Sequence, residues 1–435
     1  MRGGWRITLG LVAVVAAPLA AQQPVEVTLA EAVRRALEVQ PAVVQARGDV
    51  RNAEAGQRSA LGAFLPTITA RGFSNQASAN RLNSTGQLVS SSNTTYSGSL
   101  ELNFDLFDGF QRLANKRAAA ATEDAADAGL VNQRYQVTAT TAQLFYTALA
   151  DEELVRVAQA QVDRAKEERQ ISVNKFQAGA ATRSDTLTST VDLGNAQLAL
   201  LQAQTNLATA QATLGRQVGV DQPVRAVPDT AFPSLPDTTA LRAEALDSSP
   251  QMRQMAAKAR AAGAQVSAAR AQYWPTFSVL YSNGYTGLDR LGRFAVSPWS
   301  TTQDYFNNWM VRFSLSWTLF NGFSREANQV TASVARDVAQ AQASDTRRQL
   351  GAQLTQYIAA TFTAYAQIGI AGANVAAATE ALRVQQERYR LGAATLLDLL
   401  TAEANLTQAE VNQVQARSNY LIARAQVEAL VGHTL

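Results

Sequence analysis

Two aspartates occupy matching places in the sequence, and they are the side chains whose type and spacing best support a chemical role. Asp185 follows Thr182 by three residues, and Asp398 follows Thr395 by the same interval. In a Thr-x-x-Asp pattern the threonine can cap a helix while the aspartate bonds back to the cap, and the helix dipole favours the negative charge. Carboxylates gathered around a pore mouth would instead form a ring that attracts cations. The two roles are compatible, and both stay open at this point.

Enzyme chemistry has little support in this sequence. The chain has no cysteine and a single histidine, His433, close to the C-terminus, so no histidine–cysteine metal cluster can form. We find no nucleophile motif and no glycine-rich phosphate loop. The acidic pairs Asp151-Glu152 and Glu167-Glu168 are typical of solvated helix faces. We therefore expect no enzyme activity, no cofactor and no metal site.

The charge pattern argues against a nucleic-acid partner. The chain carries 38 Lys and Arg against 35 Asp and Glu. The basic residues are scattered singly among alanine and glutamine, whereas a nucleic-acid surface needs them clustered. We therefore expect no nucleic acid among the partners.

The first residues predict export. Arg2 and Arg6 precede a mostly apolar run from Ile7 to Ala17, and small residues follow at Ala20 and Ala21. This is the pattern of a secretory signal peptide, which we assign to residues 1–21. No later stretch approaches the roughly 18 apolar residues of a membrane helix. Without cysteine the exported chain can form no disulfide, so its stability must come from packing or assembly.

The rest of the chain consists of two tandem repeats of one unit. Three pairs of similar segments are separated by the same number of residues. For example, Gly109 and Gly322, each followed by phenylalanine, differ in number by 322 − 109 = 213. The pairs are Phe104–Phe110 with Trp317–Phe323, Lys175–Gly179 with Arg388–Gly392, and Val218-Gly219 with Val431-Gly432. An upstream pair, Pro66 and Pro275, has an offset of 275 − 66 = 209, so the halves differ in length between Pro66 and Gly109. We assign the first repeat to residues 22–219 and the second to 240–435, joined by a proline-rich linker at 220–239.

Each repeat contains two segments with the alternation of strands. We predict strands at about 65–79 and 95–108, and again at about 275–287 and 309–321. The polar stretches 80–95 and 287–308 are rich in Ser, Asn, Thr and Gly, which predicts long hairpin loops. In the last strand one parity is apolar and is predicted to face lipid: Trp309, Val311, Phe313, Leu315 and Trp317.

A soluble β-sandwich edge would show the same alternation, but two features favour a membrane. Four of the five tryptophans fall between Trp274 and Trp317, as an interfacial aromatic girdle would place them. Strands of about ten residues can cross a bilayer when tilted. Four strands cannot close a barrel alone, and open edges are not tolerated in lipid, so several chains would have to pool their strands.

Long helices make up most of what remains. A proline-free run follows each Gly-Phe pair and continues to about Gln177 and Arg390. About 65 residues at ~1.5 Å each form a rod of about 100 Å, which suits a coiled coil. The returning helices carry an apolar seam with heptad spacing. Its positions are Leu193, Ala196, Leu200, Ala203, Leu207, Ala210 and Leu214, and then Leu399, Ala402, Leu406, Ala409, Gln413, Ala416, Tyr420, Ala423, Val427 and Leu430. A two-helix coiled-coil stalk would show the same seam.

Several duplicated motifs together resemble those of a known family. They are Leu29-Ala30-Glu31-Ala32, Phe64–Thr67 with Tyr273–Thr276, Leu106–Gly109 with Leu319–Gly322, and the helical ends Lys175–Gly179 with Arg388–Gly392. In this order the chain resembles the outer-membrane efflux proteins, the TolC family, over its whole mature length.

The resemblance implies an α+β membrane protein. Three chains would form a homotrimer, with four strands from each in one transmembrane β-barrel and with the helices in a long α-helical coiled-coil tunnel. It further implies a passive exit duct in the outer membrane that extends into the periplasm. Its partners would be outer-membrane lipid, a periplasmic adaptor (membrane fusion protein) and an inner-membrane pump of the RND or ABC type. The adaptor would dock at the helical tips: Lys175, Phe176, Gly179, Arg388, Tyr389 and Gly392.

The resemblance also implies an acidic ring at the periplasmic aperture, to which we assign Asp398, Thr401 and Asp185. Asp398 matches the first acidic position of the family's ring, while Thr401 stands where the second acid would be and Ala394 where a basic residue would be. An exported coiled-coil structural or adhesive surface protein is the alternative, although it would need neither the strands nor two copies. The cargo is left open.

Overall fold

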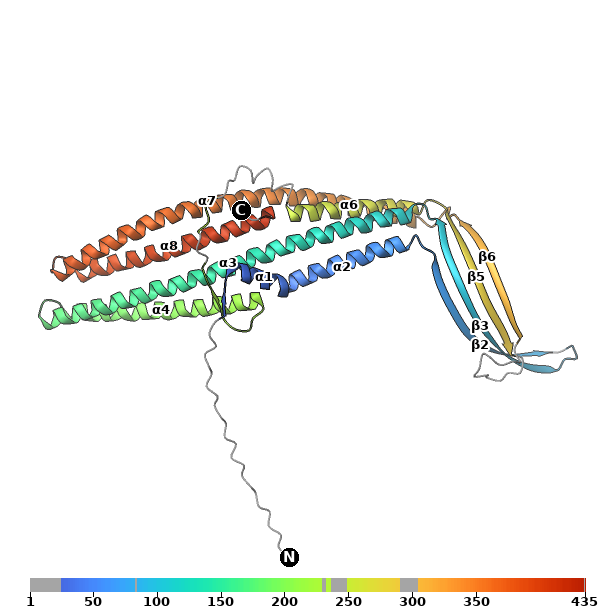
Figure 1. Ribbon diagram of the computed structural model, residues 1–435, viewed down its shortest axis with the longest axis horizontal. Coiled ribbons are helices and arrows are strands. Elements are labelled where there is room, and N and C mark those ends of the chain that lie inside the picture. The colour runs from blue at the N-terminus through green and yellow to red at the C-terminus, as the bar shows by residue number, and fades with distance from the viewer. Residues whose placement is uncertain (1–24, 83, 229–231, 236–248, 290–303, 434) are drawn as a thin grey trace, which may run out of the picture. The chain divides into compact units, whose positions relative to one another are not determined.

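The computed structural model describes residues 25–435 except 83, 229–231, 236–248, 290–303 and 434. The predicted signal peptide lies outside the described residues. The chain divides into two compact units, and the two longest helices, α3 (Gln111–Gln177) and α7 (Ser324–Arg390), run through both (Figure 1). Within the described residues, none of the helices combines the length and apolar character that crossing a membrane requires.

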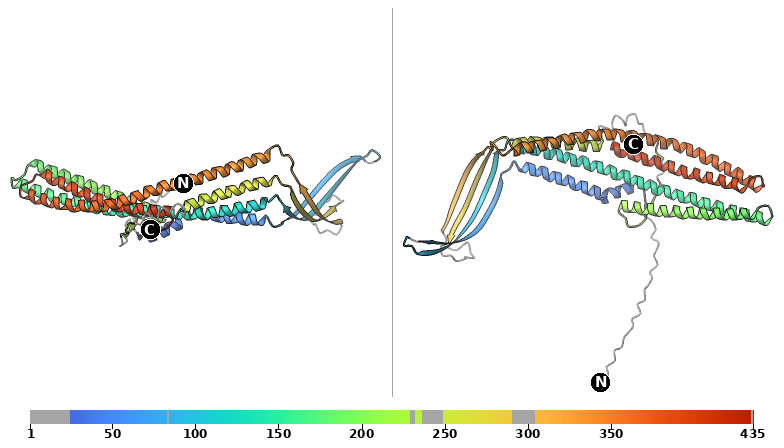
Figure 2. Two further views of the ribbon diagram at one scale, coloured as in Figure 1. Left: turned by 90° about the horizontal axis from the view of Figure 1, so that it is seen from above. Right: turned by 180° about the vertical axis from the view of Figure 1, so that it is seen from behind.

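The first unit holds two helical hairpins. The second half of α3 returns as α4 (Arg183–Val218), and the second half of α7 returns as α8 (Leu396–Val431). The turn of each hairpin can be followed in two views (Figure 2). A short parallel pair, β1 (Val25–Val27) and β4 (Val224–Ala226), and the helix α1 (Leu29–Val39) pack against the first hairpin.

The second unit holds the sheet and the helices that lead into it. Its strands are β2 (Thr67–Leu82), β3 (Leu88–Phe107), β5 (Thr276–Asp289) and β6 (Asp304–Ser316). They form one antiparallel sheet in the order β2-β3-β5-β6. Two helices precede the strand pairs, α2 (Pro41–Gly62) and α6 (Pro250–Ala271).

The helix bounds confirm the duplication. Helices α3 and α7 each have 67 residues and α4 and α8 each have 36, and their starts differ by 324 − 111 = 213 and 396 − 183 = 213. Helices α2 and α6 each have 22 residues, and their starts differ by 250 − 41 = 209. The change in length therefore falls in the strand region between them, as the sequence predicts. The rods end at Gln177 and Arg390, which were also predicted.

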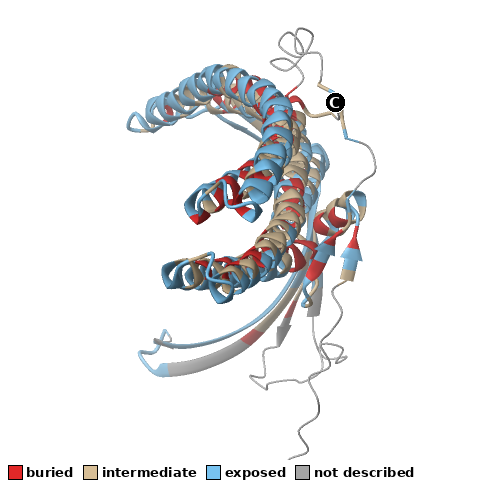
Figure 3. Ribbon diagram, turned by 90° about the vertical axis from the view of Figure 1, so that its left-hand side faces the viewer, coloured by how far each residue is buried: buried red, intermediate tan, exposed pale blue. Residues whose placement is uncertain are grey.

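The predicted seams are the sides on which α4 and α8 pack. Every seam position is buried or half-buried, and the residues between them are mostly exposed in α4 and mostly half-buried in α8. Alanine alternates with larger residues along the seam, so the helices can approach closely and the larger side chains fill the gaps. Figure 3 shows buried positions alternating with intermediate and exposed ones along the helices.

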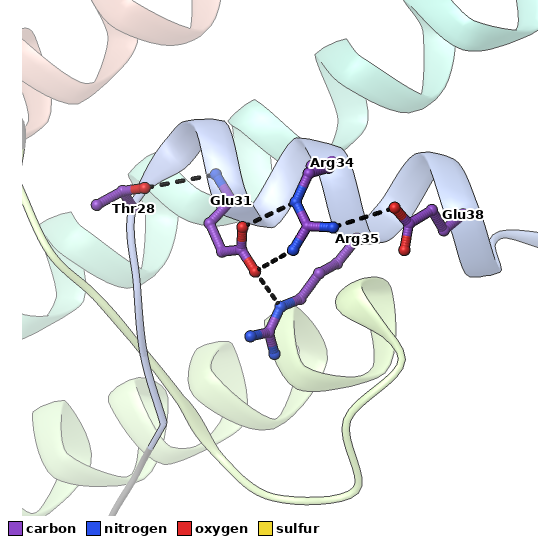
Figure 4. A network of polar contacts seen from close by, with 5 residues as sticks. All are labelled: Thr28, Glu31, Arg34, Arg35 and Glu38. Carbon is purple, nitrogen blue, oxygen red and sulfur yellow. Dashed lines mark hydrogen bonds and ion pairs between the residues drawn. The ribbon is translucent and has the colours of Figure 1, made fainter.

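A salt-bridge network explains the acidic residue in the Leu-Ala-Glu-Ala motif. Thr28 caps α1 by accepting a hydrogen bond from the backbone N–H of Glu31 at 3.4 Å. The Glu31 carboxylate accepts from Arg34 at 2.7 Å and from Arg35 at 2.6 Å (Figure 4). The hydrogen bond from Arg34, and then that from Arg35, lowers the pKa of Glu31 to about 2. The glutamate therefore stays charged and organises the surface of the first helical turns.

The first polar stretch that we predicted as a long loop belongs largely to strands, so that prediction was wrong for residues 80–95. Strand pairing continues without interruption from Thr67↔Asn103 to Leu82↔Leu88, which leaves only a short turn. In the second hairpin the pairing reaches Leu288↔Asp304, and residues 290–303 lie outside the described part. An antiparallel ladder satisfies backbone groups whatever the side chains are, so a Ser- and Asn-rich stretch can extend a strand that apolar residues begin.

Candidate functional site: the helical turns and the strand surface

The turn between α3 and α4 is built by a glycine and a capping box. Gly179 has φ 71°, the left-handed conformation that ends a helix at low cost. The backbone N–H of Thr182 donates to the Asp185 carboxylate at 2.9 Å, and the backbone N–H of Asp185 donates to the Thr182 hydroxyl at 3.3 Å. The capping role predicted for Asp185 is therefore confirmed.

The turn between α7 and α8 repeats this arrangement with one additional bond. Gly392 has φ 77°. The Asp398 carboxylate accepts from the backbone N–H of Thr395 at 2.9 Å and from its hydroxyl at 2.8 Å. These bonds, backbone first, lower the pKa of Asp398, and the charge of Arg388 acts in the same direction. Asp398 is exposed, so it caps the helix while presenting a firmly ionised carboxylate to solvent.

The third residue assigned to the aperture carries no charge. Thr401 is exposed on the same helix, one turn after Asp398. Its hydroxyl donates to the backbone carbonyl of Leu397 at 2.8 Å. Because the hydroxyl bonds within its own helix, this position adds a polar but uncharged group beside the Asp398 carboxylate.

The residues assigned to adaptor docking divide into surface and interior. Phe176 and Arg388 are exposed beside their turns, whereas Tyr389 is only 5% exposed and belongs to a buried apolar cluster. Lys175 donates from Nζ to the Tyr389 carbonyl, and its ammonium group lies 3.7 Å from the centre of the Tyr389 ring. Burial lowers the pKa of Lys175, against the effect of Asp185. Lys175 and Tyr389 therefore hold the two hairpins together, and of the two only Tyr389 is buried.

The sheet presents one apolar face, as the alternation predicts. Phe313 lies opposite Val279, Val311 opposite Tyr281, and Leu315 opposite Phe277, so the apolar parities of β5 and β6 coincide. The other parity places Arg312 opposite Leu280 and Ser314 opposite Ser278. The five residues predicted to face lipid, Trp309, Val311, Phe313, Leu315 and Trp317, are all exposed in the single chain. Trp317 lies just beyond the end of β6, where its indole N–H donates to the Tyr273 carbonyl at 3.2 Å.

Two arginines stabilise the connections between strand and helix, and our sequence analysis did not consider them. Arg112 donates from Nε to the Asp108 carboxylate at 3.0 Å and lies over the Phe64 ring. Its counterpart Arg325 donates to the carbonyls of Thr318 and Leu319 at 2.7 and 2.9 Å. The signal was present in the sequence, because the two arginines share the offset of the repeat, 325 − 112 = 213.

One acidic residue that we expected on a solvated face is buried. Glu168 on α3 is only 3% exposed, and neither of its carboxylate oxygens has a hydrogen-bond partner. Asp192 on α4 and Glu403 on α8 lie beside it, with ligand oxygens of the three side chains all within 4.8 Å of one another. Burial is the main cause that raises the pKa of Glu168, to about 9, and Glu403 adds to it. The sequence could not show this, because the cluster joins three helices.

Duplicated long hairpins that continue into an antiparallel sheet with an apolar face define a class of outer-membrane channel proteins. The sequence pattern of the family described as outer membrane efflux protein matches residues 32–220 and 241–433. The chain belongs to this family. Membership places it in the outer membrane, with its helices extending into the periplasm, and assigns it to efflux channels, which are not a family of enzymes.

Solved structures share the fold at low sequence identity. The outer membrane channel CmeC of Campylobacter jejuni matches with a TM-score of 0.79 and 19% identity, over 93% of this chain and 85% of that one. The outer membrane protein VceC of Vibrio cholerae matches with 0.80 and 18%, over 93% and 96%. The MtrE outer membrane channel of Neisseria gonorrhoeae, solved in its open state, matches with 0.75 and 19%, over 93% and 89%. No curated protein matches the sequence.

Proposed function

We propose that this chain forms the exit duct of a tripartite efflux or type I secretion system. Three copies would close a twelve-stranded barrel in the outer membrane and a helical tunnel in the periplasm. A periplasmic adaptor and an inner-membrane pump of the RND or ABC type would deliver the cargo. The observation that carries the proposal is the four-stranded sheet, which is apolar on one face and has open edges at β2 and β6.

Open strand edges explain why one chain is not enough. Lipid cannot satisfy the backbone groups of an edge strand, so a membrane-spanning sheet has to close on itself. Joining β6 of one copy to β2 of the next would remove both edges in a ring of copies. The strands also exceed the bilayer: β3 has 20 residues, which is about 65 Å at ~3.3 Å each, against a hydrocarbon core of about 30 Å. The Ser- and Asn-rich ends would then extend beyond the lipid.

A second apolar stripe on α4 supports a ring of copies along the helices. Leu187, Val191, Leu198 and Leu201 recur with heptad spacing on the side of α4 opposite its buried seam, and all are about 60% exposed. Exposed apolar positions at this spacing are the mark of a helix that packs against another helix. In a homotrimer, the stripe would be covered by a neighbouring copy.

Cysteine substitution tests the trimer interface directly, because the chain has no native cysteine. A cysteine at Leu198 is expected to resist a water-soluble maleimide in the assembled protein and to react after dissociation in denaturant. A cysteine at the exposed neighbour Gln197, which lies about 100° around the helix, should react in both states. Equal labelling of both positions in the native protein would contradict the interface.

The exposed Asp398 carboxylate gives the proposed duct an acidic aperture. Three copies would place three like charges near one axis, where they attract cations. We expect Asp398→Asn to weaken cation preference and divalent-cation block in bilayer recordings, because the ring loses its charge while the side chain keeps its size.

Asp185→Asn is the matched control, because it alters the same kind of cap in the other turn. We expect the Asp398 change to act more strongly, since only that turn matches the family's acidic ring. If both variants act equally, both turns line the mouth. If neither affects conductance, selectivity or block in an intact trimer, the ring does not exist and capping alone explains both aspartates.

The surface residues beside the turns are the proposed contacts for the adaptor. Phe176 is 44% exposed at the end of α3, and Arg388, the counterpart of Lys175, is exposed near the end of α7. Gly179 and Gly392 allow the turns to be tight enough for a partner to approach the backbone. Lys175 and Tyr389 would contribute indirectly, by holding the two turns in register.

A further inference from the structure

We propose that Glu168, Asp192 and Glu403 bind one divalent cation, with calcium the best match, and that this ion joins helices α3, α4 and α8 within each chain. The three carboxylates come from three different helices of the same unit, and ligand oxygens from all three lie within 4.8 Å of one another. Oxygens bound to a common calcium ion at 2.3–2.6 Å lie no more than about 5 Å apart, so this spacing fits a shared ion.

The unpartnered state of Glu168 points to a missing ligand. Both of its oxygens are buried and neither accepts a hydrogen bond from the protein. A buried carboxylate without a partner is among the costliest groups in a folded protein, because it loses hydration and gains nothing in return. Glu403, at 7% exposed, is nearly as buried and adds a like charge. As carboxylates, neither can donate to the other, so the pair needs a proton or a cation between them.

In the described part of the chain no lysine or arginine forms an ion pair with Glu168, Asp192 or Glu403. Arg164 lies one turn before Glu168 in the sequence of α3, and its guanidinium group is directed to Glu410 at 3.2 Å and to Thr407 at 3.1 Å. Burial is the main cause that raises the pKa of Glu403; the charges of Asp192 and Glu167 add to the rise, and the charge of Arg164 opposes it. The net charge at the cluster therefore remains negative when its members are ionised.

The surroundings select the kind of ion. The donors are carboxylate oxygens only, which suit hard cations, whereas zinc and copper prefer the imidazole and thiolate groups that are absent here. The neighbouring residues on the same helices, Ala165, Ala196 and Leu399, are buried and apolar. Magnesium usually keeps several of its waters, so a mostly buried site favours calcium. Asp192 is only half-buried, which leaves the ion a route from solvent.

Calcium binding to the purified full-length protein in detergent tests the proposal. After dialysis against a chelator and its removal, titration with calcium chloride is expected to show one saturable site per chain. A site at the Asp398 aperture would instead bind one ion per three chains. We expect Glu168→Gln and Glu403→Gln to weaken calcium binding at least tenfold. Glu167→Gln removes the same charge from the exposed neighbour, which acts on Glu403 only through its charge, and should lower the affinity much less.

Thermal unfolding separates loss of binding from loss of folding. Without calcium, Glu168→Gln should unfold at about the same temperature as the native protein, because the raised pKa keeps the Glu168 carboxyl protonated and glutamine is also neutral. Calcium should raise the midpoint of the native protein and of Glu167→Gln, and not that of Glu168→Gln. If Glu168→Gln does not fold, Asp192→Asn, at the half-exposed edge, provides the same comparison. A native protein without saturable calcium binding, or a Glu168→Gln variant that binds as well, would overturn the proposal. Neither result would affect the proposed duct.

Discussion

Arginine in place of Phe313 is expected to destabilise the membrane-inserted protein by about 2–4 kcal/mol per chain if the residue lies near the bilayer midplane. Phe313 is 66% exposed on the apolar face of β6 and lies opposite Val279. Its ring stacks on that of Phe277, with the two ring centres 6.3 Å apart. A charged side chain there would have to enter hydrocarbon. The shift in the denaturation midpoint of protein reconstituted in lipid vesicles measures this cost.

Ser314→Arg is the control, because it introduces the same side chain one residue away on the other face. That face would line the water-filled interior, so we expect little loss of stability. Cysteine labelling gives an independent reading: a membrane-impermeant reagent should reach position 314 more readily than 313. If 313 reacts more readily, or if the two arginine variants are equally stable, the assignment of lipid and interior faces is wrong.

Alanine in place of Gly109 is expected to destabilise the chain by about 2–5 kcal/mol. Gly109 has φ 68°, where a Cβ costs roughly 1–2 kcal/mol. A Cβ would also lie 2.5 Å from the Ala271 carbonyl oxygen and 2.8 Å from the Trp274 Cβ, so the end of α6 would have to move. Such overpacking costs about 1–3 kcal/mol more.

The duplicated chain supplies its own control for this substitution. Gly322 has φ 65°, but nothing lies within 4 Å of an added Cβ there. Gly322→Ala should therefore show the conformational cost alone, about 1–2 kcal/mol. Denaturant unfolding of the two variants under the same conditions compares them. Equal losses at both positions would show that the contact with Ala271 is not tight.

Regular patterns made the helices predictable. The ends at Gln177 and Arg390, the glycine turns, and the capping by Asp185 and Asp398 follow from residues that are close in sequence, and the repeat allowed each half to check the other. The strands were predicted where apolar and polar residues alternate. The polar ends of the strands were not predicted, because residues such as Ser90 and Asn93 are common in loops. Pairing with β2 places them in a strand.

Contacts between segments that are far apart in the sequence could not be predicted from it. Tyr389 lies close to a helix end, where we expected a surface residue. The packing of the two hairpins buries it instead, with Lys175 over its ring. Glu168 stands beside an exposed acid and was predicted to share its environment. Its environment differs because Asp192 and Glu403, on two other helices, lie beside it. Nothing in the sequence around these three residues indicates that they meet.

The mass of the native particle tests the central proposal most directly. The full-length chain, expressed with its own N-terminus and recovered from outer membranes, would be weighed in detergent by native mass spectrometry. We predict that detergent is needed to extract the protein and that each particle contains three chains. Recovery of a water-soluble monomer without detergent would contradict the proposed duct and favour an exported coiled-coil surface protein.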